Sequence, residues 1–164
     1  MNAIVAVDAK WGIGQGNELL FSLRGDMKHF RAMTTGKTIL LGRKTLETFP
    51  GGRPLPNRRN VVLTTCDKEI EGASVVHTVQ ELMDAAQGEE PDNVFVAGGG
   101  TVYTALLPYC KRVYMTKIDA AVEGADTFFP NLDKLPGWEV EETSEPMEEN
   151  GITYRFVTYV NTKI

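Results

Sequence analysis

The chain has 164 residues, enough for one domain with a hydrophobic core and too few for two domains of ordinary size. Its formal charge of −5 argues against a general nucleic-acid binder, which needs a basic face. The two cysteines are too few for a disulfide framework, and the two histidines lack metal-ligand spacing, so we expect no bound metal. The N-terminal residues are typical of a strand and not of a secretory leader, and no apolar run approaches membrane-spanning length. We therefore expect a cytoplasmic protein that contacts neither nucleic acid nor membrane.

The order of apolar and polar segments predicts alternating strands and helices. Buried-type strands are expected at residues 3–7, 38–42, 61–65, 74–77, 94–97 and 112–118. Helices are expected from a cap at Ser22 to about residue 33, over 79–87 and over 101–107. The glycine-containing segment 11–17 is expected to be a loop, and 138–142 and 152–160 an antiparallel pair joined around Asn150 and Gly151. This alternation predicts an α/β fold with a mostly parallel sheet, helices on both faces and an antiparallel C-terminal edge.

Polar groups follow the strands at 38–42 and 61–65. The first strand runs into Gly42, Arg43, Lys44 and Thr45, and the second ends in hydroxyl side chains. In an open α/β sheet, such groups at the carboxyl ends of strands bind a phosphate-bearing ligand. Arg43 and Lys44, together with Thr65, suit a phosphate monoester. The alternative is that these are ordinary solvated surface cations.

The loop at residues 50–59 carries arginines between prolines, which stiffen the backbone and aim the guanidinium groups. Arg58 suits a carboxylate because its planar fork matches that group. The alternative is that Arg53, Arg58 or Arg59 hydrogen-bonds loop carbonyls and has a structural role.

Asp26 is the most conspicuous acidic residue. On a helix, Asp26, Phe30 and Met33 share one face, so a single carboxylate lies on an otherwise apolar stripe. An unpaired buried carboxylate is costly, and we expect a cationic or hydrogen-bonding partner. This pattern favours a functional site, and the alternative is an aspartate that satisfies free backbone donors in the first turn of the helix.

Three consecutive glycines, Gly98 to Gly100, lie between a buried-type strand and a helix. Glycine allows a ligand to approach the backbone closely, and a helix N-terminus favours phosphate. The alternative is an ordinary tight turn, in which glycine is common.

In this order the segments resemble the dihydrofolate reductases of bacterial chromosomes, over almost the whole chain. The matching segments are Ile4 to Asp8, Gly12 to Gly14, Asp26 with Phe30, Gly42 to Thr45, Gly52 to Asn60, Ala97 to Tyr103, Tyr114 to Ile118 and Glu123 to Pro130. The resemblance implies one domain over residues 1–164 with an eight-stranded sheet and an adenosine-binding subdomain at about 38–88. It implies NADPH-dependent reduction of 7,8-dihydrofolate to tetrahydrofolate for one-carbon metabolism, by a monomer that antifolate inhibitors would also bind.

The resemblance also implies roles for individual residues. Asp26 would hold the pterin ring, Thr116 would support that carboxylate, and Arg58 would take the glutamate-tail carboxylate. The substrate pocket would be lined by Ile4, Val5, Met27, Phe30, Phe49, Leu55 and Ala97. The ribose phosphate would be surrounded by Arg43, Lys44, Thr65 and His77. The rest of the cofactor would be held by Ala6, Ile13, Gly14, Gly42, Thr45, Leu63, Thr64, Ala97, Gly98, Gly99, Gly100, Thr101, Val102, Tyr103 and Thr127.

The chain departs from the family pattern just before Asp26. The usual pattern there is Leu-Pro-Trp, one residue and Leu-Pro, whereas residues 19–24 read Leu-Leu-Phe-Ser-Leu-Arg. Two prolines are absent, and Phe21 replaces the indole that orders a water near the substrate. We expect the 11–21 loop to control proton delivery through water, with Leu19 and Phe21 joining Asp26 as the catalytic residues.

Two other functions are compatible with parts of the sequence. One is a reductase of the same fold that acts on a pyrimidine intermediate of riboflavin synthesis, which should lack the tail-binding Arg58. The other is a non-catalytic nucleotide-binding module, which would not explain the carboxylate of Asp26 on an apolar helix face.

Overall fold

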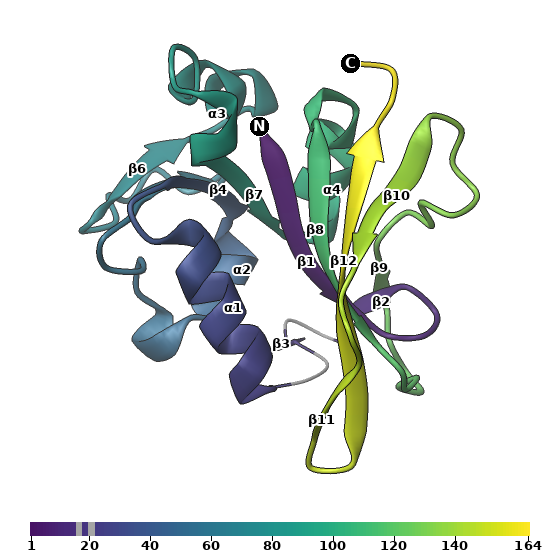
Figure 1. The fold of residues 1–164 in the computed structure, drawn as a ribbon. Coiled ribbons are helices and arrows are strands. Elements are labelled where there is room, and N and C mark those ends of the chain that lie inside the picture. The colour runs from purple at the N-terminus through teal and green to yellow at the C-terminus, as the bar shows by residue number, and fades with distance from the viewer. Residues whose placement is uncertain (16–17, 20–21) are drawn as a thin grey trace.

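The computed structural model describes residues 1–15, 18–19 and 22–164, and its main feature is one large mixed sheet (Figure 1). Its strands are β1 (Asn2–Val7), β4 (Thr38–Gly42), β5 (Arg59–Leu63), β6 (Ala73–Val76), β7 (Val94–Gly98), β8 (Arg112–Ile118), β10 (Trp138–Thr143), β11 (Met147–Glu149) and β12 (Ile152–Asn161). Eight strands follow the order β10-β12-β8-β1-β7-β4-β5-β6, and β11 pairs with β12 beside this path. The eight-stranded α/β fold expected from the sequence is therefore confirmed.

The strand directions also agree with the sequence. β1 runs parallel to β7 and β8, and β4 runs parallel to β5 and β7. The long strand β12 is antiparallel to β8, β10 and β11, which makes the C-terminal edge antiparallel. As a result, β1, β4, β5 and β7 all end at the same edge of the sheet, where the polar residues predicted to bind a ligand follow them.

Helices cover both faces of the sheet (Figure 1). They are α1 (Arg24–Thr34), α2 (Arg43–Glu47), α3 (Val79–Ala85) and α4 (Gly100–Leu106), with short 3-10 turns at Pro50–Gly52, Pro91–Asn93 and Leu107–Tyr109. Alternate residues of β4 serve the two faces: Leu40 packs in the cluster with α3 and α4, whereas Ile39 and Leu41 pack in the cluster with α1 and α2. All three are 0% exposed, which explains why β4 is continuously apolar.

The segment expected to be a loop at 11–17 contains a strand instead. β2 (Gly12–Gln15) pairs with β3 (Glu18–Leu19) and with β9 (Thr127–Phe128) in a small antiparallel sheet. The expectation was wrong because glycines leave no alternation of apolar and polar side chains in β2, and one partner strand is more than a hundred residues away in sequence. This pairing attaches the β2 segment to residues 125–129, since the N–H of Asp126 also donates to the carbonyl of Gly14 at 3.0 Å.

The expected cap at Ser22 is also wrong. Helix α1 begins at Arg24, and Leu23 in the capping position makes no side-chain hydrogen bond. The free N–H groups of Arg24 and Gly25 instead donate to the carboxylate of Glu149, at 2.7 and 3.1 Å. Glu149 belongs to the C-terminal hairpin. The antiparallel pairing expected for 138–142 and 152–160 is present, but the turn at Asn150 and Gly151 joins β12 to the unexpected short strand β11 and not to β10, which pairs farther along β12.

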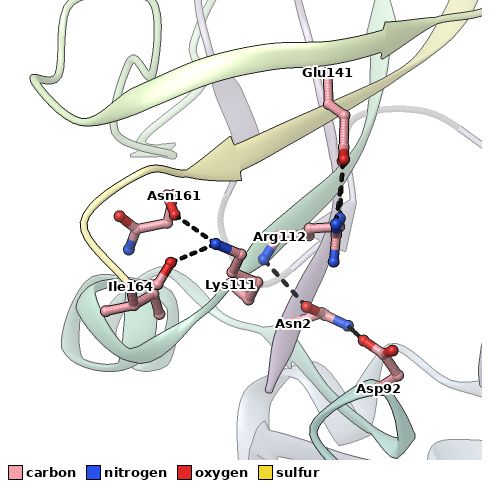
Figure 2. Close-up of polar contacts among 7 residues, drawn as sticks. All are labelled: Asn2, Asp92, Lys111, Arg112, Glu141, Asn161 and Ile164. Carbon is pink, nitrogen blue, oxygen red and sulfur yellow. Dashed lines mark hydrogen bonds and ion pairs between the residues drawn. The ribbon is translucent and has the colours of Figure 1, made fainter.

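A network of hydrogen bonds and an ion pair joins the strands at the end of the sheet opposite the carboxyl ends of β1, β4, β5 and β7 (Figure 2). Asn2 donates to Asp92 at 3.2 Å and accepts from the N–H of Arg112 at 3.1 Å, while the Arg112 guanidinium holds Glu141 at 2.8 and 3.2 Å. The Lys111 ammonium donates to the carbonyls of Asn161 and Ile164 (Figure 2), and the Lys111 N–H donates to the carbonyl of Met1. These bonds connect β1, β8, β10 and β12 at the edge farthest from the strand ends that form the site.

No helix within the described part of the chain combines the length and the apolar character that crossing a membrane requires.

Candidate active site

A cavity of about 840 Å³ opens where β1, β4, β5 and β7 end. Every residue that the sequence assigned to cofactor binding lines it: Ala6, Ile13, Gly14, Gly42, Arg43, Lys44, Thr45, Leu63, Thr64, Thr65, His77, Ala97, Gly98, Gly99, Gly100, Thr101, Val102, Tyr103 and Thr127. The topology explains this convergence, because parallel strands bring their carboxyl ends to one edge.

Glu47, Thr48, Thr78 and Val79 also line the cavity, and the sequence analysis missed them. Thr78 had a recognisable signal, because a threonine three residues before a glutamate is typical of a helix N-cap. Its hydroxyl accepts from the N–H of Glu81 at 3.0 Å at the start of α3. Glu47 carried a weaker signal: it is four residues after Arg43 on α2, and the two side chains form an ion pair at 3.5 Å.

One end of the cavity is cationic. Arg43 and Lys44 are exposed in the short helix α2, and His77 lies nearby at the end of β6. The Nδ1 atom of His77 is 2.8 Å from the carbonyl oxygen of Thr64, so this nitrogen carries a proton and donates. Arg43 and Lys44 thus lie at a strand end that lines the cavity, where an anionic ligand can bind Lys44 and compete with Glu47 for Arg43.

The glycine turn between β7 and α4 forms another wall. Gly98 has φ +122°, and a Cβ atom there would lie 3.2 Å from the Thr45 hydroxyl. A Cβ at Gly100 would lie 2.7 Å from the Thr127 methyl group. The backbone conformation at Gly98 and the close packing at Gly98 and Gly100 therefore require glycine even without a ligand. An ordinary tight turn, the alternative given above, is enough to explain these residues. The bond between Gly98 and Gly99 is a cis peptide.

Asp26 has the hydrogen-bonding partner that the sequence led us to expect. The Thr116 hydroxyl on β8 donates to the Asp26 carboxylate at 2.6 Å, and Thr116 is 2% exposed. Burial raises the pKa of Asp26, although the bond from Thr116 acts in the opposite direction. The alternative role, in which Asp26 satisfies donors of the first helical turn, is not supported, because those of Arg24 and Gly25 are bound to Glu149.

Asp26 lies near the cavity. In the ladder between β1 and β8, Thr116 is opposite Ala6, and Ala6 lines the cavity. The apolar residues assigned to the substrate lie in the same region. Ile4, Phe30, Phe49, Leu55 and Ala97 belong to one hydrophobic cluster, and Val5 lines the cavity. Together they form an apolar wall beside a single carboxylate.

The remaining three expected residues are Met27, Leu19 and Phe21. Met27 is 51% exposed on α1, so it is not part of the packed wall. Leu19 lies in β3, within a stretch whose side chains are not described, and Phe21 lies outside the described residues. Their catalytic roles rest on the sequence.

The structure gives the three arginines of the proline loop different surroundings. The Arg58 guanidinium donates to the hydroxyls of Thr34 and Thr35 at 2.8 and 3.3 Å and to the carbonyl of Pro56 at 3.1 Å. These bonds use three of its five N–H groups and fix its orientation, and two donors remain for a ligand. Arg59 has the structural role considered for this loop, since it binds Glu89 at 3.0 Å and the carbonyl of Ala85 at 2.6 Å. Arg53 is exposed.

A cavity at the carboxyl ends of parallel strands, beside a partly buried carboxylate, is the arrangement of a nucleotide-dependent α/β enzyme. The family model for dihydrofolate reductase matches residues 1–161. The dihydrofolate reductase of Bacillus subtilis is 41% identical over 159 residues, covering 95% of this chain and 91% of that protein. That of Staphylococcus aureus is 36% identical over 166 residues and covers 99% of both chains.

A solved structure supports the same family. The dihydrofolate reductase from Enterococcus faecalis, in complex with NADP(H) and RAB-propyl, superposes with a TM-score of 0.84 at 38% identity, covering 97% of this chain and 94% of that one. The chain belongs to the dihydrofolate reductase family.

The bond between Thr116 and Asp26 gives a direct test of this geometry. A hydrogen bond donated to a carboxylate favours its charged form, so Thr116→Val should raise the pKa of Asp26 above that of the parent. Thr116→Ser keeps the hydroxyl and should leave the titration close to the parental one. The measurement is the ¹³C shift of the labelled Asp26 carboxyl group against pH, and an unchanged midpoint in the valine variant would mean that the bond is not formed in solution.

Proposed function

We propose that this protein reduces 7,8-dihydrofolate to 5,6,7,8-tetrahydrofolate with NADPH and so supplies one-carbon metabolism. The observation that carries the proposal is the Asp26 carboxylate, held by Thr116 in an apolar wall beside a cavity whose opposite end is cationic. A non-catalytic nucleotide-binding module has no use for this carboxylate. A reductase for a pyrimidine intermediate has no use for the fixed guanidinium of Arg58.

The residues present fit the cofactor. The cavity is large enough for a dinucleotide, Arg43 and Lys44 provide charge for a phosphate, and the backbone of the glycines at 98–100 lines the cavity. NADPH, when bound, supplies the hydride. We assign its adenosine half to a subdomain at about residues 38–88, which contains β4, β5, β6, α2 and α3.

The chain's own residues orient the substrate and control its proton. Asp26 hydrogen-bonds a pterin ring through the ring nitrogen and amino group, and its charge favours a pterin that is about to gain a proton. The apolar wall excludes water from the stacked rings and limits their orientations. Arg58 receives a carboxylate of the glutamate tail with its two remaining donors. Antifolate inhibitors would compete for the same pocket.

We infer further that the protein acts as a monomer in the cytoplasm. Among the described residues, the exposed large apolar side chains are few and come from separate segments of the chain: Met27, Tyr109, Phe128, Leu135, Val140 and Ile164.

The loss of NADPH absorbance in the presence of dihydrofolate tests the proposed reaction. Oxidation that depends on dihydrofolate supports it. Cofactor binding without any turnover would favour the nucleotide-binding module, and turnover of a pyrimidine substrate alone would favour the related reductase.

Asp26→Asn keeps the size of the side chain and removes its charge. We expect turnover near pH 7 to fall by on the order of a hundredfold or more, because the charge stabilises the transition state. The variant should be at least as stable as the parent at pH 7. Burial raises the folded-state pKa of Asp26, so its ionisation costs stability as pH rises from the unfolded towards the folded pKa. Steady-state kinetics and thermal unfolding measure both, and activity within a few-fold of the parent would exclude this role.

Arg43 and Lys44 should make the enzyme prefer NADPH to NADH by at least about tenfold, since each charge-assisted contact is worth roughly 1.5–3 kcal/mol. Replacing both with alanine should reduce the preference mainly through the Michaelis constant for NADPH. Alanine at Lys10 and Lys134 removes the same charge from exposed positions that do not line the cavity, and should leave the preference unchanged. A double variant that still discriminates like the parent would place the phosphate elsewhere.

Arg58→Leu should weaken binding of dihydrofolate by about 2–4 kcal/mol while a pterin without the tail binds nearly as before. Arg53→Leu, in the same loop, should have little effect on either ligand. Titration calorimetry with both ligands distinguishes the residues. Equal losses for the two ligands in the Arg58 variant would show that its bonds to Thr34, Thr35 and Pro56 are its main contribution.

A further inference from the structure

Helix α1, which carries Asp26, is capped by a residue from the other end of the chain. One carboxylate oxygen of Glu149 accepts from the N–H of Arg24 at 2.7 Å and the other accepts from the N–H of Gly25 at 3.1 Å. These two bonds lower the pKa of Glu149, so it is ionised at neutral pH. A full negative charge therefore lies at the first turn of the helix, immediately before Asp26.

The contact between the hairpin and the helix is close. A Cβ atom at Gly25 would lie 2.0 Å from the Tyr154 hydroxyl and 3.8 Å from the Glu149 carboxylate. Tyr154 is 4% exposed on β12, so it cannot move aside easily. Glycine at position 25 thus permits an approach of Glu149 and Tyr154 to α1 that a side chain there would prevent.

The following strand, β12, also contacts α1, one turn beyond Asp26. On β12, Phe156 is opposite Thr116, the residue that hydrogen-bonds Asp26. The ring of Phe156 stacks on His29 of α1 with centroids 3.9 Å apart. The first two turns of α1 are therefore fixed by the β11–β12 hairpin at two points, one through Glu149 and one through Phe156.

We propose that Glu149 is a positioning residue of the active site, whose carboxylate caps and fixes the first turn of α1 and whose charge acts on Asp26 in that turn. The proposal rests on the function proposed above for Asp26. In this proposal two acidic residues control the reaction: Asp26, and Glu149 from the C-terminal hairpin.

Two effects of Glu149 act in the same direction. A neighbouring negative charge disfavours ionisation of Asp26. In addition, the carboxylate neutralises the positive end of the helix dipole, which would otherwise favour ionised Asp26 in the first turn. Both effects keep a proton on Asp26 to higher pH.

The other charged or titratable groups around Asp26 do not replace this effect. His29 favours ionised Asp26 when it is protonated, but burial lowers the pKa of His29, so at pH 7 and above it is neutral. Burial raises the pKa values of Tyr154 on β12 and Tyr103 on α4, and both stay neutral there. Arg24, in the same turn, is exposed and offsets part of the charge of Glu149. Among the described residues, Glu149 is thus the ionised acidic group that acts on Asp26 above neutral pH.

Glu149→Gln removes the charge and keeps an oxygen that accepts a hydrogen bond. In pre-steady-state hydride transfer from pH 5 to 10, the rate at low pH should stay within about twofold of the parent. At pH 9 the rate should be roughly two- to fivefold lower, because the charge of Glu149, like that of Asp26, favours a proton on the bound pterin. This is the size of effect that one charge has at a helix N-terminus. In the protein without ligands, the ¹³C titration of the Asp26 carboxyl group should move to lower pH.

Glu148→Gln removes the same charge from the exposed neighbouring residue and should change neither profile. Glu149→Asp keeps the charge on a shorter side chain and should keep the parental behaviour above neutral pH even if the cap is weakened. A low-pH rate that falls with no movement of the titration, or equal shifts for the Glu148 variant, would overturn the proposal. The ¹³C titration needs no substrate, so it tests Glu149 even if the protein fails to reduce dihydrofolate.

Discussion

The hydrogen bond between Thr116 and Asp26 is the interaction on which the rest of the active site depends. It joins residues 90 positions apart and ties helix α1 to β8, a strand next to the centre of the sheet. A carboxylate in this apolar region costs stability, and a single hydroxyl bond offsets only part of that cost. The fold must therefore hold α1 by other means as well, and the β11–β12 hairpin supplies them through Glu149 and the packing of Phe156 on His29.

The elements predicted well from the sequence are those whose signal is local. The continuous apolar run at Thr38–Gly42 identified a buried parallel strand, and the polar residues after it identified the cationic end of the cavity. The carboxylate on the apolar face of α1 could be recognised from helical spacing alone, together with its need for a partner. In each case, the residues that allowed the prediction lie within a single strand or within a few turns of one helix.

The elements missed from the sequence depend on distant partners. Nothing in Gly12–Gln15 indicates that it pairs with Thr127–Phe128, and nothing near Arg24 indicates that Glu149 caps the helix. The arginines of the proline loop are equivalent in the sequence. They differ in the structure only because Thr34 and Thr35 face Arg58 and Glu89 faces Arg59. Which residues bind ligands remains a prediction, which the geometry supports by bringing them to one cavity.

Lys111 holds both ends of this chain, since its N–H donates to Met1 and its ammonium group donates to Ile164. The two ends therefore lie at the same end of the sheet, within reach of one lysine side chain (Figure 1). A short linker of a few residues would span them, which makes the chain suited to circular permutation, with new ends opened in an exposed turn such as Asn150–Gly151. Opening that turn would cut the covalent link between Glu149 and β12, and only the ladder between β11 and β12 would then hold Glu149 against that strand. The active site could then be altered by cutting the backbone of the hairpin, as well as by substituting its residues.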